Sequence, residues 1–258
     1  MNERNLLVIL RYDGRAFHGW QVQQNAVTAM ETFQTALEGI LQEHVDVKGC
    51  SRTDAGVHAA RYGVSFKTSC AIPCAGLVRA LGAALPPAMS ALACHEVPAD
   101  FHARYSAKGK RYRYRILNSA IRDPFLEGFV YRVAPPLDAA AMNEAAQAFV
   151  GTHDWSSFCN AGGAVRDPVR TVFSAAVTRE NDLVAFSVEG DGFLYHMVRI
   201  MAGTLIDLDR GVLPRGSLPD IIAARERSRA GFTAPAEGLM LEDVFYDLPA
   251  LSKGGVLR

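Results

Sequence analysis

Hydrophobic residues in the first hundred positions follow two periodicities, the alternation typical of strands and the spacing typical of helices. Apolar or alternating runs predict four strands, at residues 6–12, 45–51, 60–68 and 89–97. Apolar positions three and four apart predict two helices, at residues 28–44 and 73–85. Thr28 followed by Glu31 has the form of a capping box, and Pro73 suits a helix start. The predicted order of elements is β-α-β-β-α-β.

A comparable series follows in the rest of the chain. Apolar and alternating runs predict strands at residues 110–117, 169–179, 183–190 and 239–248, of which the second and third form a hairpin. Helical spacing predicts helices at residues 137–151, 193–208 and 218–227. Asp138 is placed to cap the first of these helices, and Gly151 to end it.

This order predicts an α+β protein with two ferredoxin-like halves, each a split β-α-β unit with a mainly antiparallel sheet. We expect domains at residues 1–104 and 105–258, with the boundary between Asp100 and Lys108. No sequence identity between the halves supports this division, which depends on element order alone. A single domain built from the same elements is the alternative.

Composition excludes several classes of protein. Hydrophobic side chains make up 49% of the 258 residues, and 27 basic residues balance 27 acidic ones. Any basic surface for nucleic acid must therefore be local. The apolar run at the N-terminus is too short for a signal peptide, and no window is long enough for a membrane span. The five cysteines form no C-x-x-C pair and no zinc-ligand pattern, so we expect reduced thiols in a cytoplasmic protein.

The segment from Gly49 to Val64 lies around a predicted hairpin and contains Arg52, Asp54 and His58. Asp-Ala-Gly is favourable turn chemistry, because aspartate bonds nearby backbone and glycine adopts positive φ. A turn alone does not require the arginine or the histidine. An adjacent arginine holds a carboxylate ionised, and an ionised carboxylate can act as nucleophile or base. Both interpretations of the aspartate stay open at this point.

Positive charge is most concentrated in RYSAKGKRYRYR, residues 104–115, which has six basic residues, three tyrosines and no acid. On a strand, the last three arginines, Arg111 among them, share one face, and Tyr112 and Tyr114 share the other. Two interpretations are open. The arginines either keep a solvated edge strand from aggregating, or they contact RNA phosphates beside a tyrosine that stacks on a base.

Arg199 is a charge within the apolar helix predicted at residues 193–208. A buried arginine requires a partner, and we expect Asp54 to provide the carboxylate. His196 is expected to be a hydrogen-bonded helix residue and not a catalytic base.

The polar loop DGRAFHGWQVQQN, residues 13–25, either folds back with Trp20 buried or lines a cleft. The sequence contains no phosphate-binding glycine motif and no metal-ligand pattern. We therefore expect neither a cofactor nor a metal.

Five segments resemble, in this order, the tRNA pseudouridine synthases that modify positions 38 to 40 of the anticodon stem-loop. The segments are RYDGRAFHGWQVQ, SRTDAGVHA, FHARYSAKGKRYRY, GFLYHMVR and APAEGLML, and the resemblance extends from Arg11 to Tyr246. RTDAGVHA together with FHAR makes the resemblance highly specific.

The resemblance implies that Asp54 is the catalytic nucleophile and that Arg52 enters the RNA as the target uridine leaves its stack. It also implies that Tyr112 packs against the flipped uracil, that Arg199 pairs with the aspartate and that Leu239 closes the pocket. The expected protein is a homodimer whose halves flank a positively charged cleft for tRNA, with no metal or cofactor. The expected reaction breaks the C1′–N1 bond of uridine, rotates the uracil and rejoins it through C5.

Four positions depart from the family pattern, namely Ser51, Arg15, Met30 and Ile200, where glycine, threonine, glutamine and asparagine are usual. None of them removes a catalytic group, but loop contacts select the substrate, so the sequence leaves open which tRNA positions are modified. Two other functions fit parts of the sequence. A non-catalytic RNA-binding protein on the same fold would not need the complete catalytic set, and a small-molecule enzyme using Asp54 would not bind RNA.

Overall fold

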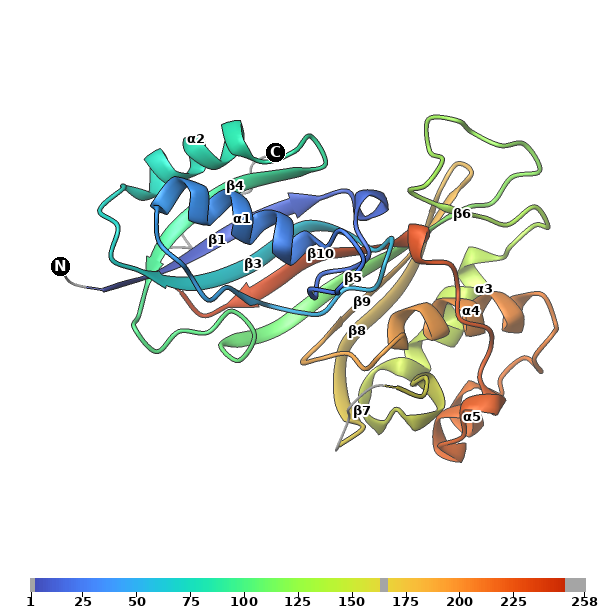
Figure 1. Cartoon of the computed structure of the whole chain (residues 1–258). Helices are drawn as coiled ribbons and strands as arrows, with labels where there is room; N and C mark the ends of the chain where they lie inside the picture. Colours follow the sequence, from blue (N-terminus) through green and yellow to red (C-terminus); the bar gives the residue numbers. More distant parts are fainter. Residues whose placement is uncertain (1–2, 163–166, 249–258) are drawn as a thin grey trace. The chain divides into compact units, whose positions relative to one another are not determined.

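The computed structural model describes residues 3–162 and 167–248, and it confirms the predicted α+β class (Figure 1). The chain forms two compact units. One comprises the described residues up to Lys108 and those from Leu241 onward, and the other is Gly109–Met240. Within each unit, the strand pairs are mainly antiparallel.

The first unit begins with strand β1 and, before the last strand of the chain, has its elements in the predicted order. These elements are β1 (Arg4–Tyr12), α1 (Ala29–Leu41), β2 (Lys48–Gly49), β3 (His58–Thr68), α2 (Cys74–Ala84) and β4 (Met89–Val97). Most of β10 (Leu239–Tyr246) also belongs to this unit. The strands lie in the order β4-β1-β3-β10, and β2 pairs with β3.

Local sequence explains the centre of this unit. Five consecutive apolar residues of β1, from Leu6 to Leu10, are buried because β3 and β4 flank the strand. Thr28 caps α1, since its hydroxyl oxygen accepts a hydrogen bond from the Glu31 amide over 3.4 Å. Helix α1 then packs on the sheet through Phe33. The structure thus confirms the central strand and the Thr28 half of the predicted capping box.

Two predicted bounds in this unit are wrong. Helix α1 ends at Leu41 and not near residue 44, because Gln42 adopts a left-handed φ of 55°. The strand predicted at residues 45–51 is reduced to the two residues of β2. The backbone of Val45 bonds instead to the side chains of Gln34 and Glu38 on α1.

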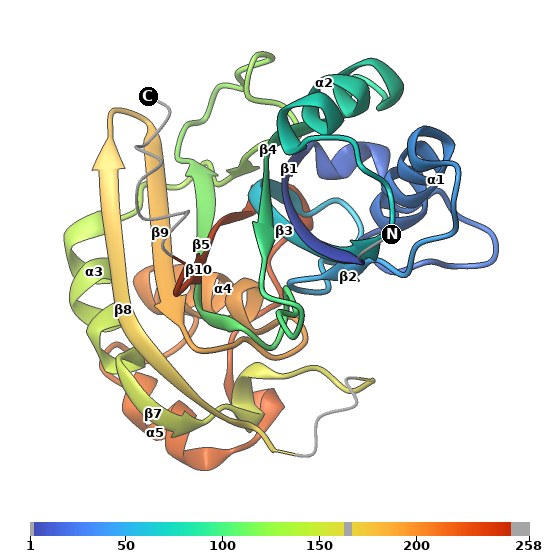
Figure 2. The same ribbon diagram turned by 90° about the vertical axis from the view of Figure 1, so that its left-hand side faces the viewer.

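The second unit contributes strands in the order β5-β9-β8-β7, with β6 parallel to β5. Its strands are β5 (Ala107–Leu117), β6 (Tyr131–Arg132), β7 (Gly151–Asp154), β8 (Val169–Glu180) and β9 (Leu183–Gly190). Its helices are α3 (Ala139–Ala146), α4 (Met197–Asp209) and α5 (Leu218–Ala224). Helix α3 packs against β8 and contacts α4 (Figure 2).

Sequence patterns predicted most of these elements but not all. Asp138 caps α3 as expected, and Asn181, with φ of 52°, lies in the turn of the predicted β8–β9 hairpin. Strands β6 and β7 were not predicted. Helix α4 begins at Met197 and not at residue 193, because His196 has φ of 63° and cannot continue a right-handed helix.

Candidate functional site

Asp54 lies in the loop between β2 and β3, at the first position of a tight turn. The Val57 amide donates to the Asp54 carbonyl over 3.1 Å, and Gly56 has φ of 81°. This is the turn that Asp-Ala-Gly predicts. The Asp54 side chain is half-buried and Arg52 is exposed. The turn therefore begins at a half-buried aspartate, and an exposed arginine lies two residues before it.

The loop of residues 13–20 packs on this turn, backbone against backbone. The Trp20 amide donates to the Thr53 carbonyl over 3.1 Å. Gly19 has φ of 90°, and a Cβ there would lie 2.6 Å from the Thr53 carbonyl oxygen. Only glycine permits both this conformation and this approach. The contact fixes the backbone immediately before Asp54.

An aromatic cluster holds the two loops together. Trp20 is buried, with its ring centroid 4.3 Å from that of Tyr62 and 6.4 Å from that of Tyr12. The Tyr62 hydroxyl donates to the Ser51 carbonyl, and the Tyr12 hydroxyl lies 2.8 Å from Thr53 Oγ1. The loop therefore folds back with a buried tryptophan, which decides between the two arrangements that the sequence left open.

His58 begins β3 and connects it to the same loop. Its buried Nδ1 accepts from the Gly14 amide over 3.1 Å and lies 3.3 Å from an Asp13 carboxylate oxygen. The Arg15 guanidinium holds the pKa of the Asp13 carboxyl below its usual range. The structure thus gives His58 a part in positioning the loop that packs on the Asp54 turn, which sequence reasoning did not foresee.

Strand β5 shows the predicted alternation of basic and aromatic residues. Tyr112 and Tyr114 are buried, whereas Arg113 is exposed. Arg111 forms an ion pair with Glu189, which lies opposite it on β9. A phosphate approaching Arg111 would have to compete with this carboxylate. Sequence reasoning missed the pair because a cross-strand partner is set by register, which no local pattern gives.

The two tyrosines contact different segments of the second unit. The Tyr112 ring meets the Phe193 ring nearly at right angles, with centroids 5.1 Å apart. The Tyr114 hydroxyl donates to the Pro235 carbonyl over 2.8 Å. Burial raises the pKa of the Tyr114 phenol above its usual range, so the group is a neutral donor.

Leu239 is buried and begins β10, directly after Gly238. A Cβ on Gly238 would lie 2.7 Å from the Tyr114 ring and 2.9 Å from the Arg115 carbonyl oxygen. A glycine is needed for so close an approach. The EGL segment is therefore packed directly on β5, the strand that contains Tyr112.

Arg199 lies half-buried in the first turn of α4. Its Nε donates to the Ala234 carbonyl over 2.7 Å, and the Ala234 amide donates back to the Arg199 carbonyl over 3.1 Å. A backbone oxygen thus accepts one of the hydrogen bonds that the Arg199 guanidinium can donate. Asp54 belongs to the first unit and Arg199 to the second, and their pairing stays a prediction.

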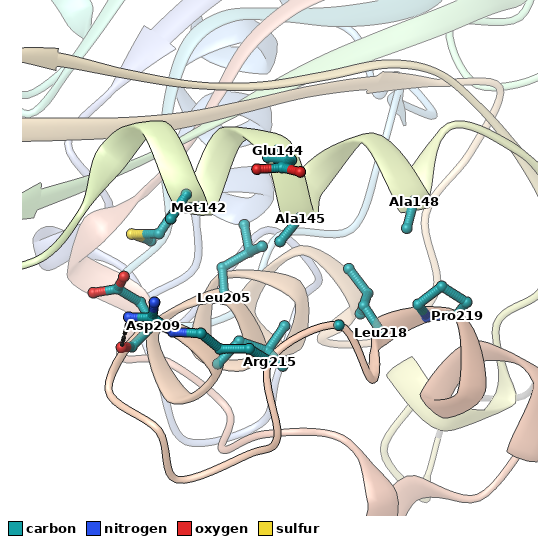
Figure 3. A pocket seen from close by; sticks show the side chains of 12 residues that line it. Met142, Glu144, Ala145, Ala148, Leu205, Asp209, Arg215, Leu218 and Pro219 are labelled. Carbon is teal, nitrogen blue, oxygen red and sulfur yellow. Dashed lines mark hydrogen bonds between the residues drawn. The ribbon is translucent and has the colours of Figure 1, made fainter.

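A cavity of about 400 Å³ lies elsewhere in the second unit, among α3, α4 and the start of α5 (Figure 3). Its lining includes Met142, Leu205, Leu218, Glu144, Asp209 and Arg215. The cavity uses the C-terminal part of α4, whereas Arg199 lies in the first turn of this helix. The cavity lining therefore includes none of the candidate residues of this unit, Tyr112, Arg199 and Leu239.

The described residues include no group of three or more histidine, cysteine or acidic side chains placed to hold a metal ion. The five cysteines are free thiols. Among the helices that the structure describes, none has the length and hydrophobicity needed to span a bilayer.

Comparison with known proteins places these residues in a family. A family model described as tRNA pseudouridine synthase matches residues 8–106 and 145–247, which include Asp54, Arg199 and Leu239; Tyr112 lies between the matched segments. The tRNA pseudouridine synthase A of Acetivibrio thermocellus is 46% identical over 243 residues, covering 94% of this chain and 100% of the relative. That of Halalkalibacterium halodurans is 46% identical over 230 residues, covering 89% and 88%. That of Clostridium acetobutylicum is 41% identical over 243 residues, covering 94% and 100%. The chain therefore belongs to the tRNA pseudouridine synthase family.

Proposed function

We propose that this tRNA-modifying isomerase converts uridine to pseudouridine at positions 38, 39 and 40 of the anticodon stem-loop, with Asp54 as its nucleophile. The observation that carries the proposal is the half-buried Asp54 carboxylate in the RTDAGVHA turn. The backbone on both sides of Asp54 is fixed by hydrogen bonds, through the Thr53 carbonyl and the Val57 amide. A reacting group needs such a fixed backbone in order to keep its geometry through the reaction.

The proposed reaction is balanced without an external reagent. The C1′–N1 bond of uridine breaks and a C1′–C5 bond forms, the proton on C5 is released, and N1 gains a proton. The ionised Asp54 carboxylate either adds to the base or assists at C1′ of the ribose. Both routes need the carboxylate in its charged form.

A uridine within a helical stem must leave its stack before these atoms can be reached. In our proposal, the exposed Arg52 enters the RNA as the uridine leaves, Tyr112 packs against the flipped uracil and Leu239 closes the pocket. Unstacking costs a few kcal/mol. Contact of the base with an aromatic ring returns about 1–3 kcal/mol.

Arg199 is proposed to pair with Asp54 and to hold its carboxylate ionised. The hydrogen bond from its Nε to the Ala234 carbonyl supports this role, because the bond orients the guanidinium without neutralising its charge. We further propose a homodimer in which the two halves of each chain flank a basic cleft. The exposed Arg113 on β5 is the arginine of that strand best suited to contact phosphate.

The variant Asp54→Asn tests the nucleophile. It should fold and bind tRNA but release no tritium from tRNA labelled at C5 of uridine, because the amide keeps the shape of the side chain and loses the charge that makes the carboxylate a nucleophile. Asp46→Asn is the matched control, since Asp46 is an exposed residue of the same unit. Asp54→Asn turnover within about tenfold of wild type, ~1.4 kcal/mol of barrier, would refute the assignment. Mapping pseudouridine in tRNA from cells lacking the protein tests the three positions.

A further inference from the structure

A segment of residues 230–234, here called the strap, runs along helix α4 and meets Arg199 at its end. Its bonds to the helix are Gly231 amide to Thr204 Oγ1 (3.0 Å), Phe232 amide to Asp207 Oδ2 (3.3 Å) and Ala234 amide to the Arg199 carbonyl (3.1 Å). A Cβ on Gly231 would lie 2.7 Å from Thr204 Cα, so the contact is close. The strap therefore determines where the Ala234 carbonyl, the acceptor for Arg199, is placed.

Arg227 holds the strap from outside the helix. Its Nη1 donates to the Gly231 carbonyl over 2.9 Å, and its Nη2 donates to Thr233 Oγ1 over 3.1 Å. Its Nε donates to Asn160 Oδ1 over 2.7 Å. These acceptors are neutral oxygens, and burial lowers the pKa of the guanidinium. The group is still a permanent cation that can only donate hydrogen bonds.

Because Arg227 can only donate, the orientation of the Asn160 side-chain amide is determined. Because Arg227 Nε can only donate, the amide atom that faces it must be the oxygen. The NH2 group of Asn160 then points to His196 Nδ1, over 2.8 Å. An NH2 group also only donates, so His196 Nδ1 must accept. The imidazole is therefore neutral, with its proton on Nε2.

His196 is the residue from which α4 starts. It occupies the N-cap position, with φ of 63°, and its carbonyl accepts from the Ile200 amide over 2.9 Å. Arg199 lies in the first turn of the helix, three residues later. Two series of hydrogen bonds thus connect Arg227 with Arg199. One runs through Asn160 to His196, at the start of the helix, and the other runs through the strap to the Ala234 carbonyl.

We propose that Arg227 is a positioning residue with two effects. Through Asn160, it holds His196 as an imidazole protonated on Nε2. Through the strap, it fixes the position of the Ala234 carbonyl, which accepts the hydrogen bond from Arg199. The link from Arg199 to the reaction depends on the function proposed above. The tautomer of His196 does not depend on it. Two experiments therefore test the tautomer of His196 and the role of Arg199 in turnover separately.

The first experiment is nitrogen-15 NMR of the full chain labelled on histidine, with the His196 signals assigned from His196→Gln. In the wild type at neutral pH, Nδ1 should be unprotonated and Nε2 protonated. In Asn160→Asp, one carboxylate oxygen faces Arg227 and the other faces the ring, so Nδ1 should gain a proton. Asn143→Asp is the matched control, because Asn143 Oδ1 accepts from the Val177 amide on β8 and a carboxylate preserves that bond. Protonated Nδ1 in the wild type, or unprotonated Nδ1 in Asn160→Asp, would overturn the proposal.

The second experiment measures turnover on tRNA. Arg227→Met and Asn160→Asp should each lower kcat by about tenfold or more, with little change in KM, while Asn143→Asp should match the wild type. Thermal melting identifies a variant that does not fold, and in that case the other variant carries the test. Wild-type kcat in a folded Arg227→Met or Asn160→Asp would overturn the positioning role. Wild-type kcat in Arg199→Met would instead refute the function proposed for Arg199, and the NMR result would stand.

Discussion

Replacing Gly203 with alanine tests the contact between α4 and the strap. Gly203 lies in the middle of the helix, and a Cβ there would lie 1.9 Å from the carbonyl oxygen of Phe232. Even a close carbon–oxygen contact needs about 3.3 Å. The strap must therefore move away by roughly 1 Å or more, which draws the Ala234 carbonyl away from Arg199.

Two opposing terms set the effect of this change on stability. Alanine in place of glycine inside a helix is favourable by about 0.5–1 kcal/mol. Overpacking a close contact costs about 1–3 kcal/mol, and here the obstructing atom belongs to the backbone and not to a mobile side chain. We expect a net loss of about 1–2 kcal/mol in the free energy of unfolding. In a chain of this size, the melting temperature falls by about 2–4 °C for each kcal/mol.

Scanning calorimetry measures this shift directly. Gly39→Ala in α1 and Gly82→Ala in α2 are matched controls, because no atom outside their own helices lies within 4 Å of the added Cβ. Both controls should raise the melting temperature, as a simple gain in helix propensity requires. A Gly203→Ala protein that melts above the wild type, as the controls do, would show that the strap is not packed as described.

Three further predictions concern the candidate residues. Tyr112→Phe should retain tRNA binding, whereas Tyr112→Leu should lose far more in kcat than in melting temperature; equal losses would indicate a purely structural ring. Arg113→Ala should make the slope of log affinity against log salt shallower by roughly 0.7–0.9, whereas Arg111→Ala, whose arginine is already ion-paired, should change it less; the reverse order would place the RNA elsewhere. Double-mutant cycles on thermal stability with Asp54→Asn and Arg199→Met should give a coupling of at least about 0.5 kcal/mol, and additive effects would argue against the pair.

Sequence patterns predicted the elements whose cause is local. The apolar run from Leu6 to Leu10 is rich in β-branched and leucine residues and favours a buried strand, and Thr28 directly precedes the helix that its hydroxyl caps. The turn at Asp54 was equally predictable, because it needs only a glycine with positive φ two residues later. In each of these cases, the residues that determine the structure are neighbours in the chain.

The failures share a different cause, which is that the partner is distant in sequence. Val45 resembled a strand residue, but its backbone bonds to side chains of α1. Nothing near Arg111 in the sequence indicated Glu189, which lies 78 residues later. Alternation reports that a residue is buried on one face, but it does not report which group meets that residue there.

Near Asp54 in the first unit and near Arg199 in the second, a glycine allows another segment of the chain to approach closely. Hydrophobic patterns in the sequence do not predict such contacts. In the first unit, Gly19 brings its loop onto the Thr53 carbonyl, next to Asp54. In the second, Gly203 lets the strap approach α4, and the strap provides the acceptor for Arg199. Such contacts join backbone to backbone, so they position a nearby side chain without the rotamer freedom that a contact between two side chains would retain. At both positions a glycine near a candidate site residue permits a close approach, although only the structure identifies the segment that approaches it.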